Sequence, residues 1–83
     1  MQKYRKKPVV IEAEIITKEN ALSLVSMIGG QAIEIEQTWN NGIVIPTLEG
    51  FHHGRYGDYL IRGIAGEYYP CKPEIFAQTY EIV

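Results

Sequence analysis

Apolar and polar residues alternate along residues 9–16, and this spacing of two predicts a β-strand. We expect its apolar side chains to face the core; they are Val9, Ile11, Ala13 and Ile15. Residues 31–37 alternate in the same way and predict a second strand. There, two isoleucines are expected inward and two glutamates outward: Ile33, Ile35, Glu34 and Glu36.

Between these strands the apolar spacing changes to that of one helical face, carried by Ala21, Leu24, Val25 and Ile28. Thr17 is expected to be the N-cap of this helix, because its hydroxyl can accept a hydrogen bond from a free backbone amide. Gly29 and Gly30 are expected to end the helix, since a left-handed residue often follows a helix. We expect this to be the main helix of the protein.

The dipeptide Asn41-Gly42, after Asn40, is a strong signal for a β-hairpin. The returning strand is expected to begin at residues 43–45, and Pro46 indicates that this strand lies at a sheet edge or carries a bulge. Trp39 is expected to cap the hairpin or to line a pocket. Residues 48–57 contain three glycines and no hydrophobic period, so they are predicted to form a loop.

Two further strands are predicted at residues 58–62 and 67–71, with a tight connection at residues 63–66. Residues 72–76 are typical of one helical turn, with Pro73 at its first position, and residues 78–83 predict a final strand. The order is therefore β-α-β-β-β-β-α-β. It indicates an α+β fold in which one main helix packs on a mainly antiparallel, curled sheet. The whole chain, 1–83, is expected to be a single domain, with residues 1–7 as a basic arm or strand lead-in.

The composition, with 46% hydrophobic and 22% charged residues, is that of a globular protein. Cys71 is the only cysteine, so no disulfide can form within the chain, and a reducing compartment is expected. No apolar run reaches the length of a membrane span. Because a domain of 83 residues has a small core, the sequence predicts that a partner subunit adds stability in a homo-oligomer.

The net charge of −2 argues against a dedicated nucleic-acid-binding protein, which needs a basic face. Half of the positive charge is nevertheless concentrated near the start, in Lys3, Arg5, Lys6 and Lys7. Together with Tyr4, these residues could form an arm for nucleic acid or an acidic partner. We favour the other interpretation, a solvated terminus whose charges keep an edge strand soluble.

No set of residues has the spacing of a catalytic or metal site, and no cofactor is expected. His52 and His53 are adjacent on a predicted loop, whereas zinc ligands are more often separated by two or more residues. No residue stands at a sequence position that would indicate a catalytic base for Cys71. Cys71 is therefore expected to pack as a small hydrophobic residue. The pairs Glu12 with Glu14 and Glu34 with Glu36 are what a half-solvated strand requires in any case.

Aromatic and basic residues are concentrated in the second half of the chain. Tyrosine and arginine are enriched where proteins bind their partners. We therefore expect a binding surface for an anionic or nucleotide-like ligand formed by Arg55, Tyr56, Tyr59, Arg62, Tyr69 and Lys72. The alternative is that the tyrosines fill a thin core and only their hydroxyls reach the surface.

The same region resembles a family of small phage and prophage proteins. The resemblance lies in residues 57–63 (GDYLIRG), 66–76 (GEYYPCKPEIF) and 79–81 (TYE), and extends to residues 4–13 (YRKKPVVIEA) and 45–50 (IPTLEG). It is weakest in the predicted helix and at residues 51–56, where the family often has Pro in place of Tyr56. The resemblance implies expression in the cytoplasm of an infected or lysogenic bacterium and an accessory role, but no activity and no site residues.

These observations lead to one main functional hypothesis and two alternatives. The main one is a non-enzymatic phage or prophage accessory protein. It would inhibit a bacterial defence process by binding a host protein or a signalling nucleotide. The first alternative is a small metal-dependent nuclease or hydrolase that uses Glu12, Glu14 or the histidines. The second is a minor virion or assembly protein held by pairing of edge strands.

Overall fold

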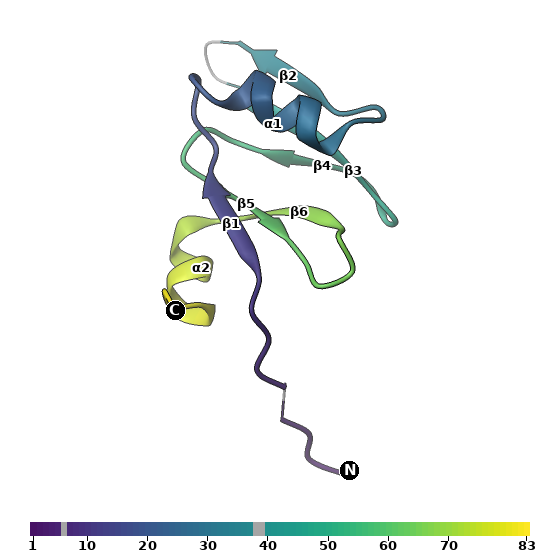
Figure 1. The fold of residues 1–83 in the computed structure, drawn as a ribbon, viewed down its shortest axis with the longest axis vertical. Helices are drawn as coiled ribbons and strands as arrows, with labels where there is room; N and C mark the ends of the chain where they lie inside the picture. The colour runs from purple at the N-terminus through teal and green to yellow at the C-terminus, as the bar shows by residue number, and fades with distance from the viewer. Residues whose placement is uncertain (6, 38–39) are drawn as a thin grey trace.

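The computed structural model describes residues 1–5, 7–37 and 40–83, and in them six strands and two helices form an α+β fold (Figure 1). The first antiparallel sheet has the order β1-β5-β6 and the second the order β2-β3-β4. The α+β class and the antiparallel, curled arrangement are thus confirmed, with the strands divided between two sheets. Within the described residues, neither helix is long and apolar enough to cross a membrane. The elements are β1 (Glu12–Ile15), α1 (Ala21–Ile28), β2 (Ile33–Glu36), β3 (Asn41–Thr47), β4 (Gly50–Gly54), β5 (Tyr59–Arg62), β6 (Tyr68–Cys71) and α2 (Pro73–Thr79).

Helix α1 begins later than the sequence predicts. Asn20, not Thr17, is the residue before its first turn, so the predicted N-cap is wrong. Thr17 and Asn20 instead form a turn of their own: the Thr17 amide donates to Asn20 Oδ1 at 2.8 Å, and the Asn20 amide donates to Thr17 Oγ1 at 3.2 Å. The predicted end is confirmed, because Gly29 has φ of 72° and its amide donates to the Val25 carbonyl at 2.9 Å.

The predicted hairpin joins β2 to β3, but its details differ from the prediction. Gly42 lies inside β3, opposite Ile35, and is not part of the turn. Pro46 was expected to mark an edge strand or a bulge, but β3 is the central strand of its sheet and its register with β4 is continuous through Pro46. Pro46 is tolerated there because the pairing with β2 already ends at Val44, so its missing amide hydrogen breaks no bond to β2. The prediction for Trp39 lies outside the described residues.

The predicted loop at residues 48–57 is wrong, because it contains strand β4, which pairs with β3 along its whole length. The connecting turn is held by Thr47, whose hydroxyl donates to the Gly50 carbonyl at 2.7 Å and accepts the Glu49 amide at 3.1 Å. A hydroxyl that bonds to the local backbone stabilises a tight turn without an Asn-Gly signal. Strand β4 has little apolar alternation, so its pairing with β3 defines it.

The predicted final strand at residues 78–83 is also wrong. Helix α2 continues through Thr79, whose hydroxyl donates to the Ile75 carbonyl at 2.9 Å. Residues 80–83 follow without pairing to any strand in the described part of the chain. The helix is favoured because Phe76 then reaches strand β5, where its ring stacks on Tyr59 with centroids 3.8 Å apart.

The strand predicted at residues 9–16 is shorter than expected, and its apolar face is open. Strand β1 begins at Glu12, and all four of its residues are exposed. Ile15 is 44% exposed and Val9, in the extended segment before the strand, is 42% exposed, so the prediction that both face the core is wrong. Ile33 in β2 is exposed as well. The alternation identified strands correctly, but no layer of the fold covers these positions.

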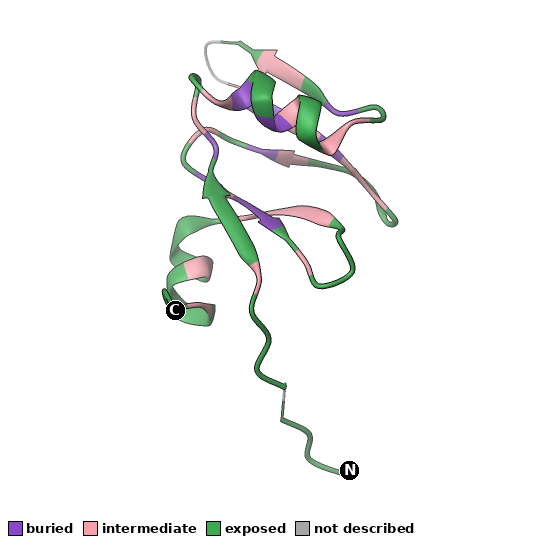
Figure 2. Ribbon diagram, viewed as in Figure 1, coloured by how far each residue is buried: buried purple, intermediate pink, exposed green. Residues whose placement is uncertain are grey.

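The core lies between helix α1 and the two sheets, where the buried residues of Figure 2 are concentrated. Its members are Ile16, Ala21, Leu24, Ile43, Ile45 and Leu60. Strand β5 is buried on both faces, since Leu60 belongs to this core while Ile61, also fully buried, faces the other side of the sheet. The side of Ile61 is the side of helix α2, and it carries the site described below.

The core depends on a close contact between the end of β1 and the end of β4. Ile16 is fully buried, and a Cβ atom placed on Gly54 would lie 2.7 Å from its Cδ1 atom and 3.2 Å from Pro70 Cβ. Both distances are shorter than ordinary van der Waals contact. Gly54 therefore leaves the space that Ile16 occupies, and a larger residue there would push the two sheets apart.

Gly54→Ala tests this contact. We expect it to lower the free energy of unfolding by about 1–3 kcal/mol, because an overpacked core must move. Ile16→Val removes the clashing Cδ1 atom and alone costs about 0.5–1.5 kcal/mol. In the double variant the two losses are expected to be less than additive, since the valine makes room for the new methyl group. Urea denaturation of the wild type, the two single variants and the double variant measures the coupling energy between residues 16 and 54. Strictly additive losses would contradict the proposed contact.

Candidate functional site

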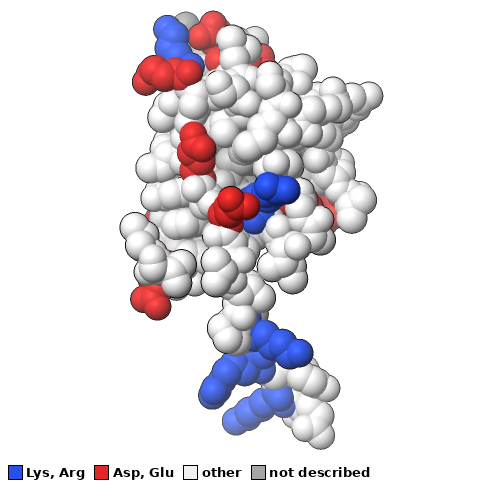
Figure 3. Space-filling view, in the orientation of Figure 1, with Lys and Arg blue, Asp and Glu red and all other residues white. Residues whose placement is uncertain are grey.

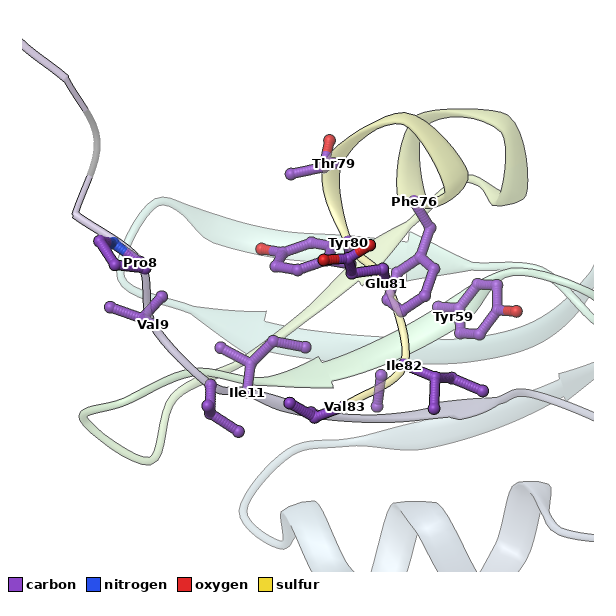
Figure 4. A pocket seen from close by; sticks show the side chains of 12 residues that line it. Pro8, Val9, Ile11, Tyr59, Phe76, Thr79, Tyr80, Glu81, Ile82 and Val83 are labelled. Carbon is purple, nitrogen blue, oxygen red and sulfur yellow. The ribbon is translucent and has the colours of Figure 1, made fainter.

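An open groove of about 700 Å³ lies between the N-terminal segment, the first sheet and helix α2 (Figure 4). Its floor is one face of the sheet, where the register places Ala13 opposite Ile61 and Ile61 opposite Tyr69. The extended segment before β1 forms one side, and α2 with the residues that follow it forms the other. The groove is thus built by both ends of the chain around strand β5.

Three aromatic rings form one wall of the groove. Phe76 of α2 lies flat against Tyr59 of β5, with centroids 3.8 Å apart and an angle of 6° between the rings. Tyr80 packs on the other side of Phe76 at 5.0 Å and 36°. Pro73 starts α2 directly after β6, and this short connection holds Phe76 over the sheet. The stack fixes the position of α2 and presents rigid aromatic surface to the groove.

Tyr69 lies on the same face of the sheet and interacts with this wall. Burial of the phenol raises the pKa of Tyr69 to about 12, and a hydrogen bond with Tyr80 and the nearby negative charges act in the same direction. The neutral form of the phenol is therefore strongly favoured in the folded protein. The Tyr69–Tyr80 bond ties the segment after α2 to strand β6.

The remainder of the groove is apolar and exposed. It is lined by four exposed aliphatic residues and one half-buried one, namely Val9, Val10, Ile82 and Val83, and Ile11. Among the described lining residues, Glu81 is the only charged one. Adjacent exposed apolar side chains can form a surface that binds another molecule.

The structure distributes the six predicted ligand residues over different surfaces. Tyr59 and Tyr69 share the groove face, as the register shows. Arg62 is on the opposite face of the sheet, where it forms an exposed ion pair with Glu12 at 3.7 Å. The predicted convergence of tyrosine rings with Arg62 is therefore absent among these residues.

The other three predicted ligand residues have separate environments. Tyr56 packs against the core, and its hydroxyl donates to Glu34 Oε2 at 3.0 Å. Burial and this carboxylate raise the pKa of Tyr56. Arg55 is exposed in the turn after β4, where its backbone amide donates to Asp58 Oδ2 at 3.0 Å. Lys72 is exposed and directly precedes α2.

The residues considered for metal or catalytic chemistry are also separated. His52 and His53 are neighbours on strand β4, so their side chains point to opposite faces. Nε2 of His53 lies 3.1 Å from the Asn41 carbonyl oxygen. Of the carboxylates, Glu14 accepts a hydrogen bond from Asn20 Nδ2 at 2.9 Å. No group of three or more potential metal ligands occurs among residues 1–5, 7–37 and 40–83.

Cys71 is half-buried on strand β6, on the groove face of the sheet. Burial raises the pKa of the Cys71 thiol, and the charges of Asp58 and Glu74 raise it further. The thiol is therefore held in its protonated form, which is the weaker nucleophile.

The sequence interpretation missed most of the groove residues. Val9 was assigned to the inward face of a strand, Ile82 to a final strand and Phe76 to one helical turn, so their place in an open groove was not expected. The signal that could have found them is the apolar character of residues 9–11 and 82–83.

In comparisons with protein-family models, with curated proteins and with solved structures, no match to this chain was found.

The position of Tyr69 leads to a titration experiment. Its folded pKa of about 12 lies above the ordinary value near 10, so the stabilisation is complete below about pH 10 and is lost as the pH rises toward 12. In an ultraviolet absorbance titration of the tyrosines, we expect Tyr69→Phe to remove a late ionisation step. Tyr4→Phe, in the exposed N-terminal segment, should leave that step in place. Because the pKa of Tyr56 is raised as well, the test is the number of late-ionising tyrosines: the same number in Tyr69→Phe as in the wild type would contradict the assignment.

Proposed function

We propose that this chain is a non-enzymatic binding protein whose groove takes an extended segment of a host protein. One observation carries the proposal. The apolar residues of β1 and of the segment before it have the pattern of a core strand, yet they line an open groove. A partner that covers them would bury surface that the chain itself leaves in water.

The groove suits an extended polypeptide in particular. In the described residues β1 pairs only with β5, so the other edge of β1 is free of strand partners. An extended segment can add to such an edge through backbone hydrogen bonds while its alternate side chains enter pockets beside it. The wall of Tyr59, Phe76 and Tyr80 offers aromatic surface for one of those side chains.

The charges favour a protein segment over a signalling nucleotide. Glu81 lines the groove, and a carboxylate there attracts lysine or arginine but repels phosphate. Arg62, the cation expected to pair with phosphate, lies across the sheet from Tyr59 and Tyr69. The segment we propose therefore carries aliphatic or aromatic side chains together with basic ones.

The biological setting is proposed from the resemblance to small phage proteins. In that setting, the binding protein would act in the cytoplasm of an infected or lysogenic bacterium. By occupying a host protein, it would inhibit a defence process.

Binding of model peptides tests the proposed function. We expect a fluorescent peptide of alternating valine and lysine to bind at least about tenfold more tightly than its valine–glutamate counterpart, because of Glu81. Fluorescence anisotropy measures both affinities. Ile82→Asp, in the groove, should weaken binding of the lysine peptide, whereas Ile64→Asp, at an exposed isoleucine outside the groove, should not.

Two results would overturn the proposal. One is equal affinity for the two peptides together with indifference to Ile82→Asp. The other is tight binding of a nucleoside triphosphate that depends on Arg62, which would return the nucleotide hypothesis to first place.

A further inference from the structure

We infer that the groove of one copy binds residues 1–7 of a second copy, so that two chains exchange their N-terminal arms in a homodimer. The inference rests on the proposed function, since it names a resident occupant for the same groove. The arm, defined as residues 1–7, is the part of the chain before Pro8, the first residue that lines the groove. A host segment would then have to displace the arm of the partner copy.

The arm extends away from the body of its own chain and can therefore contact a second copy. In Figure 1 the N-terminal segment runs away from both sheets and both helices. Tyr4 is 91% exposed, which is close to the value for an isolated chain. An exposed aromatic side chain of this size gains most when it is buried by another molecule.

The charges of arm and body are complementary. Four of the eight Lys and Arg residues lie at positions 3–7, whereas all ten Asp and Glu residues follow Ile11. Figure 3 shows the basic side chains of the arm gathered at one end of the molecule and acidic side chains spread over the body. The body thus has ten carboxylates against four cations, and an arm from a second copy is attracted to it.

Glu81 places part of this negative charge at the groove, and Glu74 adds a second carboxylate on helix α2. Glu74 lies in the first turn of α2, and Glu81 follows the last turn and lines the groove. Because the two carboxylates flank the helix that forms one wall, they attract a basic segment laid along the groove. Lys3 and Arg5 of the incoming arm are the cations that we expect to meet them.

The arm also matches the groove in its side-chain pattern. In an extended chain, Tyr4 points to the side opposite Lys3 and Arg5. Tyr4 can therefore enter the groove beside the aromatic wall while the two basic side chains lie along its rim.

Exchange between two copies explains why the arm is outside its own groove. Pro8 and Val9 line one side of that groove, so the arm begins at the rim and its direction carries it outward. A twofold axis would place each arm on the groove of the other chain, and such an arrangement closes as a dimer. Both apolar grooves would then be covered at once.

A charge-swap experiment on the full-length chain tests the inference. The arm variant carries Lys3→Glu, Arg5→Glu and Lys7→Glu, and the body variant carries Glu74→Lys and Glu81→Lys. By light scattering we expect wild type to have twice the 9.4 kDa chain mass at micromolar concentration. Each variant alone should weaken the dimer about 100-fold, and an equimolar mixture of the two should restore it as a heterodimer. Lys18→Glu, which removes a cation outside the arm, is the matched control and should stay dimeric.

The outcomes separate this inference from the proposed function. Three results would overturn the arm exchange. The wild-type chain could be monomeric, its dimer could be unaffected by either set of charge reversals, or the mixture of the two variants could stay monomeric. Binding of the valine–lysine peptide by the arm variant would in each of those cases leave the groove as a binding site. If the dimer forms as expected, the same peptide should compete with the arm and lower the measured mass.

Discussion

The packing of Ile16 against Gly54 is the contact on which the remaining architecture depends. Ile16 is the last residue before the chain leaves β1 for α1, and it is fully buried between the two sheets. Its amide donates to the Asp58 carbonyl and its carbonyl accepts the Gly57 amide, both at 2.8 Å. These bonds tie the end of β1 to the start of β5, while the side chain fills the space that Gly54 leaves in β4. One residue therefore holds the first sheet, the second sheet and the entry to α1 in register, and its place determines which face of β1 is left outside.

The candidate site results from the unequal covering of the two faces of the first sheet. Helix α1 and the second sheet cover one side of the first sheet, so the main core is confined to that side. The other side is covered only where Phe76 stacks on Tyr59 and where Tyr69 bonds to Tyr80. This cover is enough to bury Ile61, but it stops short of the apolar residues at the start of the chain. Core and groove are thus two faces of the same three strands, and the short α2 is the reason that one of them stays open.

Residue patterns predicted the fold better than the site, for reasons that particular residues make clear. The alternation in residues 9–16 and 31–37, the helical spacing of Ala21 to Ile28 and the Asn41-Gly42 pair were sufficient for the first four elements. Strand β4 was missed because its identity comes from pairing with β3 and from the Thr47 turn, neither of which leaves a hydrophobic period. The last strand was wrongly predicted because the stacking of Phe76 on Tyr59, a long-range contact, favours helix over strand. The tyrosine and arginine cluster was inferred mainly from composition, and in the folded protein Arg62 lies on the face of the first sheet opposite Tyr59 and Tyr69.

The chain's charge distribution gains its meaning only when the fold is known. Along the sequence, a basic start favours a solvated terminus over an arm for an acidic partner. In the folded protein the basic side chains of the arm stand away from the body, and the body carries all ten acidic residues together with four basic ones. A terminus that served only for solubility would have no reason to carry Tyr4 in extended, water-exposed chain next to an uncovered apolar groove. The arm and the groove are complementary. The arm carries positive charge and one aromatic ring that contacts nothing in its own chain's groove, and the groove has exposed apolar residues and a carboxylate. Because the arm is directed away from its own groove, the proposed arrangement places it on the groove of a second copy.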